Sequence, residues 1–299
     1  MCRTAGVTCE HLGCSPEHHE GLSDKSVSHV HGALRAVLAQ AVEDGVLAVN
    51  PADVKRSSRV RRAVPERVAQ VHQVSEGDYW REGEARAFLQ HRRAAGDRLL
   101  GLWEVALATG LRKSELAALT WANVDLERVD AQGRPDPELR VRRSTTVVRG
   151  KAVTTEGRGK AAGKTAAAQR EVPLAPSTVA ALRAVRAQQA ADRLACPPGA
   201  WVDSGHVFTQ ADGRPVHPTV LGDAWAAAVK ASGVRRITLH GTRHFAISMW
   251  ITAGVPILQV AKQAGHSDAG VTLRVYAHVI REDSERTRAG VEGTLYGAG

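Results

Sequence analysis

The spacing of apolar residues divides this 299-residue chain into a short N-terminal part and a longer C-terminal part. In the N-terminal part, 23–54, apolar residues recur at intervals of three and four as far as Gly45, which predicts one amphipathic helix whose apolar stripe needs a partner. Asn50-Pro51 closes this part, because proline cannot continue a helix and disfavours helical backbone in the residue before it. Residues 1–22 show no such period, so we expect a poorly ordered leader there.

The longer part, 76–280, has the patterns of both helices and strands. Apolar residues at helical spacing predict helices at about 82–95, 97–109, 111–119, 177–194 and 218–231, then three short helices across 239–279. Between 123 and 174 the pattern changes to short strand-like runs that Gly and Pro separate, which predicts a small antiparallel sheet. The sequence therefore favours a mainly α protein with a small antiparallel β-sheet, of the α+β class.

Between these two parts, the segment 55–75 is strongly basic. Its charged residues between 55 and 67 are Lys55, Arg56, Arg59, Arg61, Arg62 and Arg67, against the acid Glu66. One interpretation is a solvated interdomain linker, and another is a linker that also lies along a phosphate backbone, where neutralised phosphates release counterions. The whole chain carries 40 Lys and Arg against 31 Asp and Glu, a formal charge of +9, which is compatible with a polyanionic partner.

The sequence argues against secretion and against a membrane span. No run approaches about 18 apolar residues, and the N-terminus lacks the charged and apolar regions of a signal peptide, so we expect a cytoplasmic protein with no membrane association. Cys2, Cys9 and Cys14 could bind zinc, but their spacings do not form the paired CxxC units of common structural zinc sites. A reduced leader without metal is the simpler interpretation.

The stretch 239–279 holds the densest group of chemically active residues. Together with Arg112, Arg243 fits a phosphate-directed site, because guanidinium pairs complement the negative oxygens of a phosphoryl transition state. The hydroxyl of Tyr276 could attack phosphorus if neighbouring groups assist its deprotonation, with His240 and His266 as candidates. The alternative for each residue is a structural role, as a solvated arginine, a hydrogen-bonded histidine or a core tyrosine.

Metal binding is a second chemistry open to the histidines. His240 and His244 lie four residues apart on one predicted helix, a spacing that suits a metal ion. However, no glutamate falls inside the sequence HGTRH to act as the base of an HExxH metal site. Metal binding is therefore the weaker interpretation, and we expect no cofactor.

Four motifs across residues 109–279 together resemble those of one enzyme family. They are, in order, TGLRKSELAALTWANVDL, KTAAAQREVPL, LHGTRH and AGHSDAGVTLRVYAHV. This set is similar to the motifs of the tyrosine recombinase, or phage integrase, family, and the shared order makes the match specific where one motif alone would be weak. The resemblance implies a site-specific DNA recombinase that cuts and rejoins DNA through a covalent 3′-phosphotyrosyl intermediate, without metal or ATP.

The resemblance also implies roles for individual residues. Arg112 and Arg243 match the two arginines that clamp the scissile phosphate. His240 matches a histidine that assists proton transfer at the nucleophile, and His266 matches one that hydrogen-bonds the phosphate or stabilises the site. Tyr276, ten residues after His266, matches the nucleophile.

The family's hairpin lysine, which protonates the leaving 5′ oxygen, best matches Lys164, nine residues before Pro173, with Lys160 as the second choice. One motif departs from the family's pattern. The usual His-Asp-Leu-Arg-His reads His-Gly-Thr-Arg-His here, so Gly241 and Thr242 replace an acidic and an apolar neighbour. This exchange removes no catalytic group.

For the whole chain, the resemblance implies a catalytic domain at 76–280 behind a shortened helical core-binding domain, because 23–54 resembles only the later part of the family's four-helix domain. It further implies double-stranded DNA at the specific attachment sites of a mobile element, and accessory DNA-bending proteins. A homotetramer on DNA would follow, with the tail 281–299 packed on a neighbour.

Two rival hypotheses come from other classes of protein. The shortened N-terminal domain suits a truncated DNA-binding remnant of an integrase that cannot recombine DNA. A single-strand or RNA-binding module fits less well, since three Phe and three Tyr provide no aromatic platform.

Overall fold

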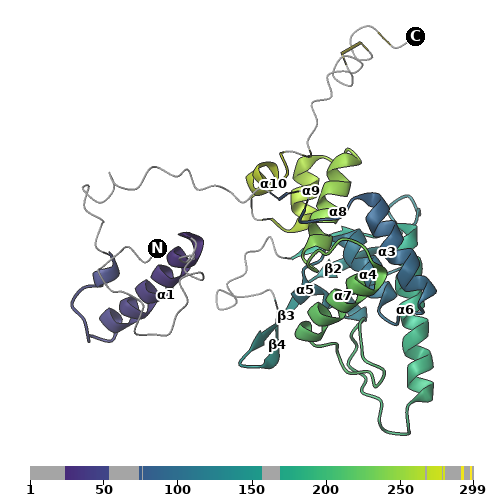
Figure 1. Cartoon of the computed structure of the whole chain (residues 1–299), viewed down its shortest axis with the longest axis horizontal. Helices are drawn as coiled ribbons and strands as arrows, with labels where there is room; N and C mark the ends of the chain where they lie inside the picture. Colours follow the sequence, from purple (N-terminus) through teal and green to yellow (C-terminus); the bar gives the residue numbers. More distant parts are fainter. Residues whose placement is uncertain are drawn as a thin grey trace. The chain divides into compact units, whose positions relative to one another are not determined.

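A computed structural model of the chain describes residues 24–53, 74–75, 77–156, 169–266, 268–277, 279, 291–292 and 297 (Figure 1). The chain forms two compact units, 1–69 and 70–299. The predicted leader 1–22 with its cysteines, and nearly all of the basic segment 55–75, lie outside the described residues. Within the described residues, no helix is long and apolar enough to span a membrane.

The described part of the first unit consists of helix α1 (Asp24–Glu43) and the short 3₁₀ helix η3 (Pro51–Asp53). This confirms the predicted helix and its closure at Asn50-Pro51. The Asn50 side chain accepts from the backbone N–H of Ala52 and donates to the Arg35 carbonyl, each at 2.9 Å, which ties the two helices together. The predicted apolar stripe is exposed, since Leu34 is 52% and Val37 is 67% accessible among the described residues.

The second unit is mainly helical, as predicted. Its α-helices are α3 (Glu82–Ala94), α4 (Leu100–Thr109), α5 (Lys113–Leu116), α6 (Pro176–Ala195), α7 (Pro218–Ser232), α8 (Gly241–Thr252), α9 (Ile257–Ala264) and α10 (Ala269–Tyr276), and the 3₁₀ helix η4 spans Trp121–Asn123. The largest differences from the prediction lie in α4 and α5. Helix α4 begins later because the Asp97 carboxylate accepts from the Leu99 N–H at 2.9 Å, and α5 is confined to Lys113–Leu116.

The strands are antiparallel, as predicted, and they form two small sheets where the sequence pattern predicts one. Strands β1 (Val124–Asp125), β2 (Glu138–Val141) and β5 (Arg170–Pro173) pair in the order β1-β2-β5. Strands β3 (Arg143–Val148) and β4 (Lys151–Glu156) form a separate hairpin. The strand-like stretch 139–148 divides at Arg142 because its first half pairs with β5 and its second half with β4.

The largest side chains of the core fix the segment that leads into α8. Trp80, Phe88, Trp103 and Trp225 pack together with ring centroids 4.9–5.3 Å apart. The Trp225 indole donates to the Ile237 carbonyl at 2.9 Å, and the Trp80 indole donates to the Arg235 carbonyl at 2.7 Å. Because buried indole N–H groups need partners, these bonds hold 235–237 against the core, just before His240.

A second apolar cluster lies where α8, α9 and α10 meet (Figure 1). Its fully buried members are Val74, Ile247, Val260, Ala264 and Tyr276. The breaks between these helices fall at Gly254 and Gly265, and both glycines have a positive φ. This cluster brings the phenol ring of Tyr276 against the helix that carries Arg243 and His244.

Candidate active site

Arg112 lies at a tight junction between two helices. Gly110 caps α4 in the left-handed conformation, with φ 60°, and the chain enters α5 only two residues later. The Glu115 carboxylate accepts from the Arg112 backbone N–H at 2.8 Å, which is the reciprocal half of a capping box. It also accepts from Arg112 Nη1 at 2.9 Å, so one carboxylate fixes both the backbone and the side chain of Arg112.

Arg243 is buried in the first turn of α8, with 3% of its surface exposed. It donates to the Gly110 carbonyl at 2.9 Å and to the Ala264 carbonyl. Burial, followed by the charges of Arg112 and Arg170, lowers the pKa of Arg243 to about 9. This pKa is still above neutrality, so the guanidinium keeps its charge at pH 7.

Three arginines hold the C-terminal end of α9. The successive carbonyls of Gln263, Ala264 and Gly265 accept from Arg170, Arg243 and Arg112, respectively. We call these three side chains the arginine clamp. The last carbonyls of a helix lack partners within the helix and form its negative end, so they are suited to accept from guanidinium groups. The clamp therefore fixes the turn that precedes His266.

Glu115 is the buried counter-charge of the clamp. Arg170 donates to both of its carboxylate oxygens, at 3.0 and 2.9 Å, and both side chains are nearly inaccessible. Burial alone would raise the pKa of Glu115, but the hydrogen bond and charge of Arg170, followed by the charge of Arg112, lower it to about 2. Glu115 is thus an anion throughout the neutral range.

His266 follows the clamped turn and contacts α10. Its Nδ1 lies 2.7 Å from the hydroxyl oxygen of Thr272, which is fully buried. Burial, followed by the charges of Arg243 and Arg112, lowers the pKa of His266 to about 4. At pH 7 His266 is therefore neutral and can donate one hydrogen bond to a phosphate oxygen.

Tyr276 ends α10 with its hydroxyl turned to α8. The hydroxyl oxygen lies 2.6 Å from His244 Nδ1, and the residue is 1% exposed. Burial raises the pKa of the phenol well above its usual range, although the charge of Arg243 acts in the opposite direction. The His240 ring packs edge-on against His244, with centroids 4.8 Å apart. Partial desolvation and the charges of Arg243 and Arg112 lower the pKa of His240.

Two adjoining hollows open beside these groups. One, of about 640 Å³, is lined by His240, His244 and Val275, among others. The other, of about 500 Å³, is lined by Arg112, Lys113 and His240. Arg236, Ile237, Thr238 and His240 line both hollows. The surface between Arg112 and His244 is therefore recessed and basic, which suits a phosphate group.

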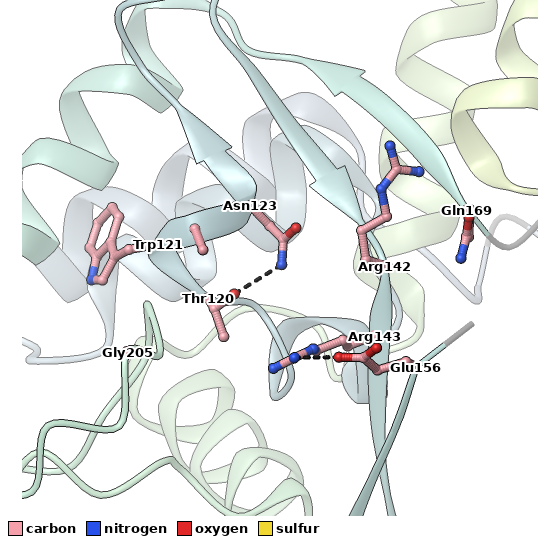
Figure 2. A pocket seen from close by; sticks show the side chains of 9 residues that line it. Thr120, Trp121, Asn123, Arg142, Arg143, Glu156, Gln169 and Gly205 are labelled. Carbon is pink, nitrogen blue, oxygen red and sulfur yellow. Dashed lines mark hydrogen bonds and ion pairs between the residues drawn. The ribbon is translucent and has the colours of Figure 1, made fainter. Parts of the chain in front are cut away.

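A third hollow, of about 760 Å³, lies on the sheet side of this unit (Figure 2). Its polar lining includes Thr120, Asn123, Arg142, Arg143, Glu156 and Gln169. Arg143 pairs with Glu156, and Asn123 donates to Thr120 at 2.9 Å. Glu156 and Gln169 flank 157–168, which carries the candidate lysines Lys160 and Lys164, and this segment lies outside the described residues.

The structure brings five of the six predicted site residues into one region, while Lys164 is not described. Arg112 and Arg243 meet at the end of α9, His266 follows directly, and His240 and Tyr276 both lie beside His244. The candidate metal pair His240 and His244 is instead packed edge-on, and His244 contacts the tyrosine.

Sequence reasoning missed three supporting residues, Glu115, Arg170 and Thr272. It named His244 only as a possible metal ligand and missed its contact with Tyr276. The spacing of Glu115 three residues after Arg112 is a capping-box signal that could have identified it. Arg170 and Thr272 lie inside two of the family's motifs, but no local spacing identifies their partners.

Comparisons with known proteins agree on one family. Residues 79–282 match the model of the phage integrase family. A tyrosine recombinase XerC-like protein of Caldanaerobacter subterraneus is 27% identical over 268 residues, which cover 88% of this chain and 64% of that relative. An integrase of Streptomyces ambofaciens is 30% identical over 268 residues, which cover 87% of this chain and 61% of that relative. The chain thus spans less than two thirds of the length of these relatives.

A solved structure shows the same fold. The Tn1549 transposon integrase in complex with transposon right end DNA has a TM-score of 0.63 at 20% identity, over 91% of this chain and 80% of that chain. This likeness confirms the expected fold class, a mainly helical domain with small antiparallel sheets. Because the family model also spans more than half of the sequence, the chain belongs to the phage integrase family of tyrosine recombinases.

Proposed function

We propose that this protein is a site-specific DNA recombinase that cuts and rejoins DNA through a covalent 3′-phosphotyrosyl intermediate. One observation carries this proposal. Two arginines, two histidines and a tyrosine from separate parts of the chain converge around the end of α9. The names of the relatives, integrases and tyrosine recombinases, support the same reaction class.

In this proposal the arginines bind the phosphate to be cut. Arg112 and Arg243 present fixed guanidinium donors toward the oxygens on which negative charge grows in the transition state. Their hydrogen bonds to the α9 carbonyls orient them before DNA arrives, which lowers the reorganisation needed during reaction. His266, neutral at pH 7, adds a donor to the same phosphate.

Tyr276 is the proposed nucleophile. Its hydroxyl oxygen attacks phosphorus as the hydroxyl proton passes to a histidine of the site, the bond from phosphorus to the 5′ oxygen breaks, and the 3′ phosphate becomes attached to the tyrosine. The leaving 5′ oxygen takes a proton from Lys164 or, as the second choice, Lys160. Rejoining reverses these steps with a 5′ hydroxyl as nucleophile. One phosphodiester replaces another of similar energy, so the reaction needs no ATP.

The partners proposed for the whole protein follow from the family. We infer double-stranded DNA at specific attachment sites of a mobile element, a homotetramer on DNA, and accessory DNA-bending proteins. Relatives of mobile elements, such as the integrase of Staphylococcus phage L54a and the ICEBs1 integrase of Bacillus subtilis, support this setting.

The test is formation of a covalent protein–DNA adduct. The full chain is incubated with nicked duplexes tiled across the DNA that flanks its gene, and adducts are separated on denaturing gels. We expect an adduct with at least one duplex, and Tyr276→Phe should abolish it while DNA binding remains, because only the nucleophilic oxygen is lost. An adduct that survives in Tyr276→Phe would contradict the assignment of the nucleophile.

The same experiment separates the proposal from its rival. A truncated DNA-binding remnant would shift the tiled duplexes in a native gel and form no adduct with any of them. The assembled clamp and the contact of Tyr276 with His244 support the active enzyme.

A further inference from the structure

The contact between Tyr276 and His244 assigns a chemical role that the sequence motifs leave to His240. We propose that His244 is the base that takes the proton from the Tyr276 hydroxyl when DNA is cleaved. This inference rests on the proposed function and names one further catalytic residue of the same site. His244 qualifies as catalytic because it contacts the reacting oxygen directly, at 2.6 Å.

Distance favours His244 over His240. A general base must lie within hydrogen-bond reach of the proton that it removes, about 2.6–3.2 Å between heavy atoms. His244 Nδ1 meets this condition, whereas His240 packs against the His244 ring in a T-shaped arrangement. In the described residues the hydroxyl of Tyr276 has this histidine nitrogen as its hydrogen-bond partner.

The surroundings of the pair explain why a base is needed and why this one can work. Burial disfavours the charged tyrosinate, so the proton must leave in concert with attack on phosphorus. Arg243, one residue before His244, stabilises the negative charge that develops on the oxygen. The half-buried His244 ring lines the hollow of about 640 Å³, so its charged form can reach water.

In both half-reactions every transferred proton has a donor and an acceptor. During cleavage, His244 Nδ1 receives the proton of Tyr276 as the tyrosine oxygen bonds to phosphorus, and the 5′ oxygen leaves with a proton from the hairpin lysine. During rejoining, the 5′ hydroxyl attacks, its proton returns to that lysine, and the His244 imidazolium gives its proton back to the tyrosine oxygen. No oxidant, metal or further reactant takes part.

The test removes the proposed base by substitution and then replaces it with imidazole added to the solution. In single-turnover cleavage of the nicked duplex that traps wild-type protein, His244→Ala should form adduct about 10²–10³-fold more slowly. Affinity for that duplex should stay within about twofold. Added imidazole should enter the hollow and restore the rate, and the restored rate should rise with the pKa of a series of substituted imidazoles, because the added base accepts a proton in the transition state.

A second substitution distinguishes a base from a positioning group. The amide of His244→Asn can occupy the place of Nδ1 and hydrogen-bond the hydroxyl, but it cannot take a proton. We expect this variant to remain slow. His91→Ala, which changes an exposed histidine on α3, is the matched control and should cleave at the wild-type rate. If His244→Ala fails to fold, the rate of His244→Asn alone decides between the two roles.

Several outcomes would overturn the inference. A near wild-type rate for His244→Asn would make His244 a positioning residue, and imidazole rescue of His240→Ala but not of His244→Ala would move the base to His240. In both cases wild-type protein still forms an adduct that Tyr276→Phe abolishes, so the proposed function stands. Absence of any wild-type adduct across the tiled duplexes would overturn both proposals.

Discussion

Glu115 is the buried acid that neutralises part of the arginine clamp. Its pKa is about 2 in the folded protein against an ordinary value of 4.5, so the folded state favours the charged form. The resulting stabilisation is fully present above about pH 4.5 and is lost as the pH falls from there toward 2. A difference of this size corresponds to a free energy of unfolding on the order of 3 kcal/mol.

We therefore expect Glu115→Gln to lower the free energy of unfolding at pH 7 by on the order of 3 kcal/mol, because Arg170 loses its buried partner. The difference from wild type should shrink as the pH falls below about 4.5. Urea unfolding at a series of pH values measures the loss of stability at pH 7 and its change with pH. Glu127→Gln is the control. Glu127 pairs with Arg183, but its side chain is 80% exposed, so this substitution should change the free energy of unfolding by less than about 0.5 kcal/mol. A pH-independent difference would contradict the assigned role of Glu115.

The pKa of His266 reports on the positive charge around its ring. Its pKa of about 4 lies below the ordinary 6.5 because of burial and the charges of Arg243 and Arg112. Unfolded chains take up this proton near pH 6.5 and folded chains only near pH 4, so acidification across this window favours unfolding. The neutral state of the ring at pH 7 follows directly.

A bound phosphate should raise the pKa of His266 toward its ordinary value, because the anion offsets the two arginine charges. NMR titration of the ring carbon signals, with and without the cleavage-competent duplex bound to Tyr276→Phe, measures the change. The signal is assigned by its loss in His266→Asn. If the pKa were the same in both states, His266 would not face the phosphate.

At the scale of elements, the end of α9 depends on a glycine. Gly265 has φ 67°, in the left-handed region that disfavours a side chain, and its carbonyl accepts from Arg112. Gly233 caps α7 with almost the same φ, 68°, in open space. The two caps have similar backbones, but only Gly265 adjoins the clamp.

We expect Gly265→Ala and Gly233→Ala each to lower the free energy of unfolding by about 1 kcal/mol. Only Gly265→Ala should slow adduct formation, by about tenfold or more, because it shifts the carbonyls that orient the arginines. Thermal unfolding and single-turnover cleavage separate these effects. Equal cleavage rates in the two variants would show that the clamp does not set the geometry of the site.

The helices could be predicted from the sequence to within a few residues, because apolar spacing and glycine caps are local signals. The end of α5 at Leu116 could not. The next residues are apolar, but the Leu119 carbonyl accepts from the backbone of Val207, a distant segment. The sequence also does not predict that 139–148 divides at Arg142, since both halves have strand character and only their partner strands differ.

The residues of the candidate site also differ in whether a local sequence signal identifies their role. Arg112, Arg243 and Tyr276 lie in motifs with recognisable spacing, and the structure brings their positions together. Arg170 also lies in one of the motifs, but its partners Glu115 and Gln263 are 55 and 93 residues away in the sequence, so no local spacing predicts its role. The contact of His244 with Tyr276 spans 32 residues and depends on how three helices pack.

At the scale of the whole molecule, the formal charge of +9 concentrates in part in the segment 55–67, outside the described residues. We predict that replacing Arg59, Arg61 and Arg62 by Gln weakens binding to unrelated duplex DNA and flattens its salt dependence. Each lost phosphate contact should reduce the slope of log K against log salt by about 0.9. Fluorescence anisotropy between about 50 and 200 mM salt measures this slope.

The matched control removes the same charge elsewhere in the chain. Arg86, Arg183 and Arg193 are exposed but already pair with Glu82, Glu127 and Asp203, respectively. Their replacement by Gln should leave the slope nearly unchanged. If both triple variants reduced the slope equally, the effect would come from net charge, and 55–67 would be only a linker.

The negative end of α9 acts, beside Glu115, as a resident counter-charge for the arginine clamp. Three guanidinium groups would repel one another in a DNA-free protein, and the negative end of α9 holds them together in the place where an anion will later bind. An incoming phosphate then shares the donors of Arg112 and Arg243 with that helix end. We expect the hold on α9 to loosen as the phosphate binds, and since only four residues separate α9 from α10, arrival of the substrate is transmitted to the helix that carries Tyr276.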